Sequence, residues 1–302
     1  MCKLIDRVLD SIQEIVNGNV PQVELRTTIL DYVKVKSDEG FPFAELLVIH
    51  YKMLKGTEED KVIPIAAAVE LLVLSFDILD DLEDQDEPSK LWMNESSLAL
   101  NASTAMIFLC IEVISKSKLK YSEKAKEIVL KYGLQAIAGQ HDDLLNRCRN
   151  EKEYIRMALK KSGSLTAIAC LVGASLAAKE VPEKIERYAP LIGLIGQLSN
   201  DLSSLQDWNG KNDLINKKYS LPAIYLLQYE ESDGVLNQYY QETLELEEFL
   251  SRQESVKRLI GDCGVIQYVE VMKRIHHNRI KEEIEQLHVN PEYMGILLNY
   301  IA

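Results

Sequence analysis

The chain has 302 residues, of which 47% are apolar, and its 34 lysines and arginines against 47 aspartates and glutamates give a formal charge of −13. This composition is ordinary for a globular protein with a sizeable core. An acidic chain without a basic stretch is poorly suited to phosphate backbones, so we expect no nucleic acid among its partners. Scattered cysteines without a CxxC pair, and a start without a signal-peptide core, predict a reduced, cytoplasmic protein that does not span a membrane.

Helical periodicity dominates the chain, and the alternating pattern of β-strands is essentially missing. Gly/Ser-rich linkers and repeats are missing too, which predicts one all-α domain over 1–302. Pro190 interrupts one expected helix and would either kink it or start a new one. In chain order, the predicted helices are 3–17, 21–35, 42–54, 64–84, 97–117, 122–147, 152–178, 182–207, 221–229, 234–252, 264–287 and 291–301.

The predicted helix 64–84 ends in a cluster of carboxylates. It is apolar almost throughout until Asp77, which indicates a buried helix. Asp77, Asp80, Asp81 and Asp84 then recur at i, i+3, i+4 and i+7, a spacing that shares one helical face. Like charges at this spacing repel, so the pattern favours a bound cation, and hard oxygen ligands suit Mg²⁺, which is commonly shared with phosphate. A solvated helix end gives the same pattern but rarely continues so apolar a stem.

A second polar cluster lies on the predicted helix 182–207. Asn200, Asp201 and Ser204 repeat the helical spacing on an otherwise apolar segment, and Gln197 lies one turn earlier. Two such clusters that face each other across a bundle could hold a substrate between metal ions. Taken alone, the second cluster would be interpreted as a helix emerging into solvent.

Two lysines, Lys161 and Lys218, are candidate contacts to a diphosphate. A lone lysine is usually surface charge, so their assignment depends on the surrounding motifs. The stretch 208–220 is polar, turn-rich and lysine-bearing, and it is predicted to be a loop that could cover a site.

Five segments appear in the order and spacing of the all-α trans-isoprenyl diphosphate synthases. The resemblance covers roughly residues 40–230, leaving a helical C-terminal part at 231–302, and the combination is more specific than any one motif. The segments resemble that family's first aspartate-rich helix, Gln-x-x-Asp helix, lysine turn, second aspartate-rich helix and lysine loop: AAAVELLVLSFDILDDLED (66–84), AGQHDDL (138–144), KKSGSL (160–165), GLIGQLSNDLSS (193–204) and GKNDLINKKYSLP (210–222).

The resemblance implies an isoprenoid-synthase helical bundle around a central cavity, Mg²⁺ as cofactor, an allylic isoprenyl diphosphate as substrate and a possible homodimer. The implied metal ligands are Asp80, Asp81, Asp84, Asn200, Asp201 and Ser204. The implied catalytic residues are Asp80, Asp81, Asp84, Lys161 and Lys218. The implied substrate contacts are Phe76, Asp77, Gln140, Asp143, Ser162 and Gln197.

Departures from the family pattern concern mainly the grip on a second diphosphate. The basic stretch of chain-elongating members is replaced by EGFPFAELL (39–47), and the paired arginines after the first motif by QDEPSKLWMNES (85–96), whose only cation is Lys90. Asn200 and Ser204 replace the outer aspartates of the second motif. The half of the machinery that ionises an allylic diphosphate is therefore retained better than the half that binds a second one.

This combination resembles the ComQ-type isoprenyl transferases, which modify a tryptophan in a pheromone precursor peptide of quorum-sensing bacteria. The local segments DILDDLEDQD, SKLWMN, LALNAS, GQHDDL and KKSGSL carry the resemblance. It implies a prenyltransferase with a geranyl or farnesyl donor and a peptide acceptor. Phe76, one turn before Asp80, would shorten the prenyl pocket, although ordinary core packing explains this ring equally well.

Three other functions stay open from the sequence. A short-chain polyprenyl diphosphate synthase would need the missing basic grip. A class I terpene cyclase is suggested by the Asn200 and Ser204 pair, but the third position of the cyclase metal triad is Trp208 here, and whether the neighbouring Asp207 joins the cluster stays open. A catalytically idle helical subunit is disfavoured by the intact DDxxD motif and the two lysines.

Overall fold

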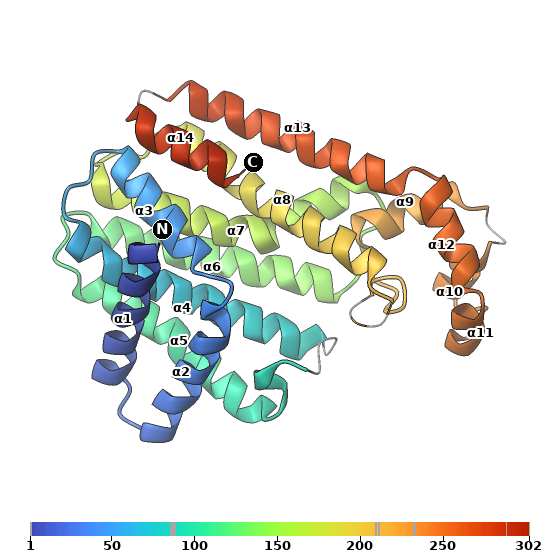
Figure 1. Cartoon of the computed structure of the whole chain (residues 1–302), viewed down its shortest axis with the longest axis horizontal. Coiled ribbons are helices and arrows are strands. Elements are labelled where there is room, and N and C mark those ends of the chain that lie inside the picture. Colours follow the sequence, from blue (N-terminus) through green and yellow to red (C-terminus); the bar gives the residue numbers. More distant parts are fainter. Residues whose placement is uncertain are drawn as a thin grey trace.

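The computed structural model describes residues 2–84, 89–208, 210, 212–231, 234–287 and 289–301, and within them every regular element is a helix (Figure 1). This confirms the predicted all-α class. The helices are α1 (Cys2–Asn19), α2 (Val23–Ser37), α3 (Pro42–Met53), α4 (Glu59–Asp84), the 3₁₀ turn η1 (Leu91–Met93), α5 (Ser96–Lys116), α6 (Ser122–Leu144), α7 (Glu151–Ala177), α8 (Glu183–Gln206), α9 (Leu221–Tyr229), α10 (Val235–Tyr240), α11 (Leu246–Ser251), α12 (Gln253–Asp262), α13 (Val265–Glu285) and α14 (Pro291–Tyr300).

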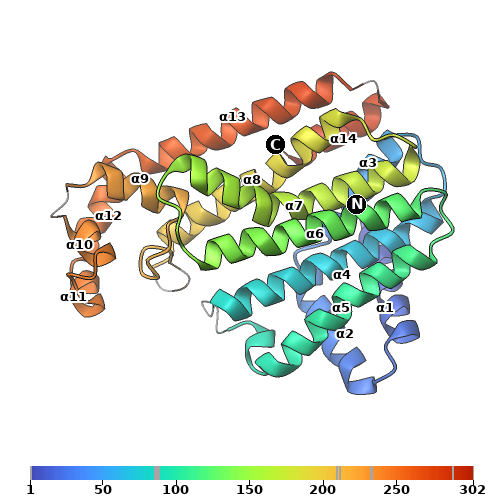
Figure 2. The ribbon, with the colours of Figure 1, turned by 180° about the vertical axis from the view of Figure 1, so that it is seen from behind.

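Two long helices, α4 and α7, form the centre of the bundle. Helix α7 packs against α3, α6 and α8, while α4 packs against α1, α3 and α5. Figures 1 and 2 show α1 and α2 beside α4 and α5, and each of the two helices contacts both. Almost every side chain of α4 from Val62 to Ser75 is buried, because a helix that is apolar on all sides is stable only inside a core.

A smaller hydrophobic cluster lies at the other end of the bundle, around the short helices α9 to α12. Its fully buried side chains include Leu214, Leu236 and Phe249. Ile266 of α13 packs against both this cluster and the main core. Leu214 of the segment 212–220 belongs to this small cluster, which therefore supports the lysine-bearing loop.

Most predicted helices are confirmed within a few residues, and the differences have local causes. Helix α4 begins five residues earlier than predicted, so Pro64 lies inside its second turn. Helix α8 continues through Pro190, so of the two alternatives left open at this proline, the start of a new helix is excluded. Pro190 packs against Gly163 of α7. A larger residue would not fit at Gly163, because its Cβ would come within 2.8 Å of the Pro190 carbonyl oxygen.

The predicted helix 234–252 was wrong in its middle, because the structure has two short helices, α10 and α11, in its place. Glu242 ends α10 in the left-handed conformation, with φ +60, which a continuous helix cannot contain. Helix α12 and η1 were not predicted. Both are short, and short helices carry too few turns for a periodic pattern to stand out.

A buried glutamate, Glu70 of α4, joins the core to the start of α3. Its Oε2 accepts a hydrogen bond of 2.7 Å from the backbone N–H of Ala44, one of the donors that a helix start leaves unpaired. Glu70 is 2% exposed, and burial raises the pKa of its carboxyl group to about 8. The neutral form is therefore the stable one inside the fold.

This raised pKa predicts a pH-dependent stability. Between roughly pH 5 and pH 8 the folded chain holds a proton at Glu70 that the unfolded chain has lost, so stability falls with rising pH, by up to ~1.4 kcal/mol per pH unit from this group. The variant Glu70→Gln keeps an acceptor for Ala44 but does not titrate. We expect its unfolding midpoint in urea to exceed that of the wild type at pH 8.5, and equal midpoints there would contradict the assignment.

Two helices, α4 and α5, are long and apolar enough to cross a membrane by length and composition alone. Within the described chain, 78% of the apolar window of α4 is buried, compared with 39% of that of α5. The core position of α4 accounts for its composition. The exposed apolar side of α5 needs another explanation, which is considered below.

Candidate active site

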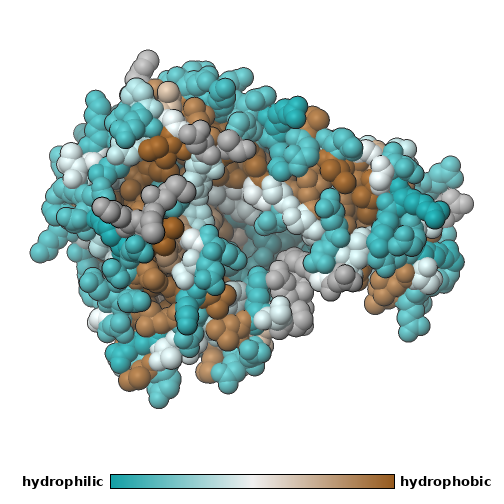
Figure 3. All heavy atoms as spheres, in the orientation of Figure 1, coloured by the Kyte–Doolittle hydropathy of each residue, from teal (hydrophilic) through white to brown (hydrophobic). Residues whose placement is uncertain are grey.

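A polar cavity of 480 Å³ opens where α4, α6, α7 and α8 converge. Figure 3 shows the front of the molecule hollowed and hydrophilic between α8 and the end of α4. The side chains that line this polar cavity are mostly acidic, amide or hydroxyl groups with three lysines: Glu39, Asp80, Asp84, Lys90, Asp143, Tyr154, Met157, Lys161, Gln197, Asn200, Asp201, Ser203, Ser204, Asp207, Asp213, Lys218 and Ser220.

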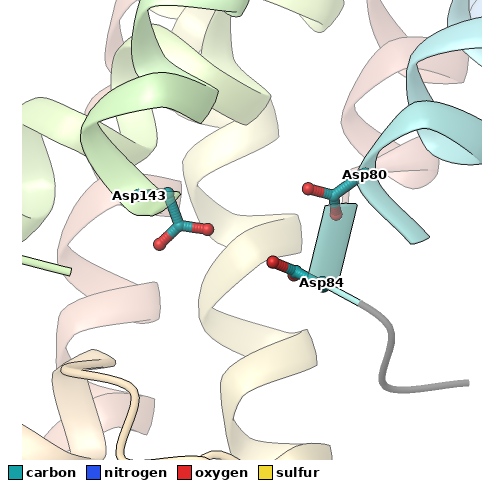
Figure 4. Close-up of side chains that lie close together, drawn as sticks. All are labelled: Asp80, Asp84 and Asp143. Carbon is teal, nitrogen blue, oxygen red and sulfur yellow. The ribbon is translucent and has the colours of Figure 1, made fainter. Parts of the chain in front are cut away.

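Three carboxylates approach one another across the polar cavity. Asp80 and Asp84 lie one turn apart at the end of α4, and Asp143 faces them from the last turn of α6 (Figure 4). One oxygen from each lies within 4.8 Å of the others. A close set of hard oxygen donors on rigid helices fits a divalent cation such as Mg²⁺. The spacing confirms that Asp80 and Asp84 share a face, and it adds Asp143 to the group.

Two lysines neutralise these carboxylates. The Nζ atom of Lys161 on α7 lies 2.8 Å from Asp80 Oδ1 and 2.7 Å from Asp143 Oδ2, while Lys218 pairs with Asp84. Burial alone would lower the pKa of Lys161, but the carboxylates of Asp143 and Asp80 outweigh it and raise this pKa. Burial raises the pKa of Asp84, and Lys218 opposes that rise. The Lys161 ammonium is therefore charged, and both lysines line the polar cavity beside the carboxylates.

Two glycines explain why Lys161 and Ser162 reach the site. Gly139 of α6 lies so close to α7 that a Cβ would come within 2.2 Å of the Lys161 nitrogen. Gly193 of α8 is equally close, since a Cβ there would lie 2.3 Å from the Ser162 carbonyl oxygen. The two contacts fix α7 between α6 and α8 at the turn that carries the lysine.

The second polar cluster is a hydrogen-bonded chain on α7 and α8. Ser162 donates to Gln197 at 2.6 Å, and Gln197 donates to Asp201 Oδ1 at 3.0 Å. Tyr154 donates to Asp201 Oδ2 at 2.5 Å. Asp201 is 4% exposed, and burial together with the nearby Asp213 raises its pKa to about 7. A carboxyl group of this kind is readily protonated when no cation is near.

The two outer residues of that cluster differ in exposure. Asn200 is exposed and lines the polar cavity, whereas the Ser204 hydroxyl is buried and accepts a hydrogen bond from the Asp213 N–H at 2.9 Å. Asp207 also lines the cavity and accepts a hydrogen bond from the Gly210 N–H at 2.9 Å. The metal-binding roles predicted for these residues stay predictions.

A second, more apolar cavity of 350 Å³ adjoins the polar one. Four residues line both cavities, namely Asp80, Lys161, Gln197 and Asn200. The remaining lining of the apolar cavity comes largely from α4 and α6: Phe76, Asp77, Leu79, Glu83, Ile107, Ala136, Ile137, Gln140, His141, Leu144, Ser162 and Leu165. An elongated apolar molecule with an anionic head therefore fits across the two.

Four predicted substrate contacts, Phe76, Asp77, Gln140 and Ser162, line the apolar cavity. Gln140 donates to Glu83 at 3.0 Å, and its side-chain oxygen is buried without a hydrogen-bond partner. Asp77 lies 3.5 Å from Lys36, and burial raises the pKa of its carboxyl group. Phe76 lines the apolar cavity, while its contact with a prenyl chain and its effect on chain length stay predictions.

Asp81 has contacts that differ from those of the other aspartates. Its carboxylate is 2.9 Å from the Lys90 Nζ and accepts a hydrogen bond of 2.9 Å from Trp92 Nε1. It lines neither cavity. Asp81 follows Asp77 by four residues and therefore lies on the same side of the helix, but its carboxylate is paired with Lys90 and Trp92. The metal-binding role predicted for Asp81 stays a prediction.

Sequence reasoning missed three residues that organise the site. Tyr154 lies two turns before Lys161 on α7, a helical spacing that could have revealed it. Asn146 holds the lysine loop by donating to the Lys217 carbonyl at 2.8 Å and accepting from the Tyr219 N–H at 2.9 Å. Tyr240 donates to the Lys218 carbonyl at 2.8 Å. Neither loop contact has a sequence pattern, and Asn209 and Lys211 of the predicted loop lie outside the described residues.

Comparisons with known proteins agree with this geometry. A family model described as Polyprenyl synthetase matches residues 44–256. A tryptophan prenyltransferase ComQ from Bacillus spizizenii is 33% identical over 92% of this chain and 99% of its own length, and a second from Bacillus subtilis (strain 168) is 34% identical over 93% of each. The crystal structure of geranylgeranyl pyrophosphate synthase from Corynebacterium glutamicum, complexed with isoprenyl diphosphate and magnesium, has a TM-score of 0.80 at 14% identity, over 99% of this chain and 97% of that one.

The extent of the family match and the shared fold define the class of protein: the chain belongs to the polyprenyl synthetase family and is a prenyltransferase. The identity of about 33% over most of the chain places it, within that family, among the ComQ-type isoprenyl transferases.

Proposed function

We propose that this protein is a Mg²⁺-dependent isoprenyl transferase that moves a geranyl or farnesyl group from its diphosphate to a tryptophan of a pheromone precursor peptide. The observation that carries the proposal is the pair of adjoining cavities. One contains the close carboxylate group of Asp80, Asp84 and Asp143 with the lysines that pair with it, and the other is more apolar. The similar ComQ proteins are tryptophan prenyltransferases. The similar synthase binds isoprenyl diphosphate and magnesium.

In this proposal, the carboxylates of Asp80, Asp84 and Asp143 hold the cation, with Asp201 on the opposite wall. Mg²⁺ bound there would neutralise the diphosphate as the allylic C–O bond breaks with its electron pair on oxygen. Lys161 and Lys218 add fixed positive charge to the leaving group. The apolar cavity keeps water from the allylic cation until an indole carbon supplies the electron pair for the new bond.

The presence of Glu39 in the wall of the polar cavity favours a peptide over a second diphosphate as the acceptor. Glu39 lines the cavity in the segment 39–47, where chain-elongating relatives were expected to carry basic residues. Glu39 pairs with Lys36 at 3.0 Å and offers no positive charge to a second diphosphate. We further propose a cytoplasmic location, supported by the free cysteines Cys110, Cys148, Cys170 and Cys263.

A product assay tests the proposal. The protein is incubated with Mg²⁺, geranyl or farnesyl diphosphate, and one of three additions: a tryptophan-containing precursor peptide, isopentenyl diphosphate, or nothing. We expect a peptide heavier by one prenyl group, and no change in a matched peptide with alanine in place of tryptophan. A longer diphosphate beside an unmodified peptide, or a hydrocarbon without any acceptor, would refute the proposal.

The length of the donor is predicted to depend on Phe76, which lines the apolar cavity one turn before Asp80. Replacing Phe76 by alanine removes the ring and deepens this cavity. We expect Phe76→Ala to accept donors one isoprene unit longer with a gain of about tenfold in kcat/KM relative to the wild type, read as the mass of the product. If the preference for donor length stays unchanged, the ring only packs the core.

We also propose a homodimer through the exposed apolar side of α5 and α6, the two helices nearest the viewer in Figure 2. Phe108 is 67% exposed and Leu134 is 70% exposed. Further exposed apolar residues on this side are Leu100, Leu130 and Ile137. Large exposed apolar side chains grouped on adjoining helices are typical of protein–protein interfaces.

A single charge at this surface tests the dimer. We expect Leu134→Glu to convert the protein from a dimer to a monomer in light scattering coupled to size-exclusion chromatography, because a glutamate at a buried interface would lose its hydration. The variant Leu246→Glu, on the exposed side of α11, is the matched control and should stay dimeric. A monomeric wild type at micromolar concentration would contradict the proposed interface.

A further inference from the structure

A third cavity, of 420 Å³, lies where α1, the first turns of α4 and the end of α5 meet. Figures 1 and 2 show this meeting point at the end of the bundle away from α10 and α11. Lys61 in this cavity and Asp80 in the active site both lie on α4, and a helical rise of about 1.5 Å per residue places them about 28 Å apart. The third cavity is therefore separate from the two cavities of the active site.

Apolar side chains from the three helices line the third cavity. They are Ile15 of α1, Ile65 of α4 and Val113 of α5. Ile15 is 6% exposed and Ile65 is 1% exposed, so both lie at the bottom of the cavity. Its volume is within the range of small-molecule pockets, and this lining suits a hydrocarbon group.

The charged side chains of the third cavity are mainly positive. Lys61, Lys116 and Lys118 line it. Among the described residues, Asp60 is the one carboxylate in the lining, and it is neutralised by Arg7, whose Nη2 lies 2.9 Å from Asp60 Oδ1. The whole chain has a formal charge of −13, so a lining with an excess of lysines stands out and favours an anion.

Lys118 and Ser117 lie on a fixed turn and offer donors to such an anion. The Ser117 hydroxyl oxygen accepts the Leu119 N–H at 3.2 Å, and Leu119 is 5% exposed, which anchors the turn in the core. Within the described chain, Lys118 has no carboxylate partner, and the Ser117 hydroxyl donates no hydrogen bond. An ammonium group and a hydroxyl group are thus both available at the cavity wall.

We propose that the third cavity is a binding site for a small soluble organophosphate with a short hydrocarbon chain. The phosphate would lie at Lys118 and Ser117, since lysine binds phosphate as a point charge. The hydrocarbon chain would lie at the bottom of the cavity, against Ile15 and Ile65. Binding here needs neither Mg²⁺ nor the prenyl-transfer reaction, because no residue of the active site lines this cavity.

A membrane surface is the other source of phosphate groups with apolar chains. Such surfaces attract clusters of roughly four to eight basic residues. Here Glu58 and Glu112 pair with Lys61 and Lys116, which breaks up the positive charge. The apolar side chains lie inside a hollow instead of projecting from the surface. A molecule that enters the cavity therefore fits better than a bilayer.

Isothermal calorimetry with hexyl phosphate tests the site. The protein is first saturated with Mg²⁺ and inorganic pyrophosphate, which occupy the polar cavity of the active site. We expect one hexyl phosphate per chain with a Kd of about 1 mM or lower. Inorganic phosphate should bind at least tenfold more weakly, because it buries no hydrocarbon. Equal affinities for the two phosphates, or no binding of hexyl phosphate, would overturn the proposal.

Four variants locate the bound phosphate. We expect Lys118→Glu to weaken the binding of hexyl phosphate at least tenfold, by loss of a charged contact, and Val113→Trp to do the same by filling the cavity. Lys120→Glu is the matched control, since this exposed lysine lies outside the lining, and it should change the affinity less than about threefold. Phe76→Ala should also leave the affinity unchanged. Equal losses in Lys118→Glu and Lys120→Glu, or a loss in Phe76→Ala, would place the probe elsewhere and refute the site.

Sedimentation with phosphatidylglycerol vesicles distinguishes the two sources of phosphate. At about 0.15 M salt, we expect the wild type and Lys118→Glu to stay equally in the supernatant. If the wild type instead sediments with the vesicles and Lys118→Glu does not, while hexyl phosphate fails to bind, the lysines contact a membrane and the proposed soluble ligand is wrong.

Discussion

Asp80→Asn is expected to lower kcat/KM for prenyl transfer at least 10³-fold. Asp80 contributes to both cavities, belongs to the carboxylate group with Asp84 and Asp143, and pairs with Lys161 at 2.8 Å. An amide at this position keeps the shape of the side chain but removes the charge that a cation needs. Losses of 10²–10³ follow the removal of one preorganised group that stabilises a developing charge, and a metal ligand contributes to several such contacts.

Asp142→Asn is the matched control for this variant. Asp142 precedes Asp143 on α6, pairs with Lys160 at 2.8 Å and lines neither cavity. We expect its rate to stay within about threefold of the wild type, because exposed ion pairs contribute little. Mass spectrometry of the prenylated peptide, with far-UV circular dichroism as a check on folding, measures both. Comparable losses of activity in the two variants would mean that Asp80 contributes only to the overall negative charge of this region and is not a metal ligand.

Lys161→Met is expected to abolish the mutual dependence of magnesium and diphosphate binding and to slow prenyl transfer at least 10²-fold. The Lys161 ammonium lies between Asp80 and Asp143, so a cation alone must compete with it for the same oxygens. A diphosphate offers the ammonium another partner. In the wild type, each ligand should therefore strengthen the binding of the other, and by linkage the effect is reciprocal.

Calorimetry of Mg²⁺ with and without inorganic pyrophosphate measures this coupling. The variant Lys161→Met removes the ammonium group that pairs with Asp80 and Asp143. Mg²⁺ alone should therefore bind more tightly to this variant than to the wild type, while pyrophosphate should bind more weakly. Lys160→Met is the control, since Lys160 pairs with Asp142, which lines neither cavity, and should leave the coupling unchanged. Unaltered coupling in Lys161→Met would show that this lysine does not compete with the cation.

The helices and the order of the site motifs could be predicted because both depend on local periodicity. Carboxylates at i and i+4 share a helical face whatever surrounds them, so Asp80 and Asp84 were placed correctly. The apolar stem of α4 likewise predicted a buried helix. The family resemblance added Asp143 and the lysines as site residues, which helical spacing alone could not connect.

Contacts between distant segments could not be predicted from a pattern. Asp143 joins Asp80 because α6 crosses near the end of α4, and the sequence contains no sign of that crossing. The Asp81 carboxylate is paired because Lys90 and Trp92 lie beside it. Asn146 holds the lysine loop through backbone groups, which every residue carries and no composition reveals.

The residues that were predicted from the sequence and those that were missed differ in their place in the site. The residues that local patterns identified, such as Asp80 and Asp84, line the polar cavity, where the proposed cation and diphosphate would need charge and oxygen donors. The residues that they missed, such as Tyr154 and Trp92, set hydrogen bonds around those groups.

The central claim is that the carboxylates of Asp80, Asp84 and Asp143 hold the divalent cation on which the diphosphate departs. A crystal structure with Mn²⁺ and a non-hydrolysable allylic diphosphate, read by anomalous scattering, tests it most directly. We expect an anomalous peak within about 2.3 Å of oxygens from these carboxylates, with the Lys161 and Lys218 ammonium groups moved onto the diphosphate. A peak elsewhere, with Lys161 still between Asp80 and Asp143, would contradict the account.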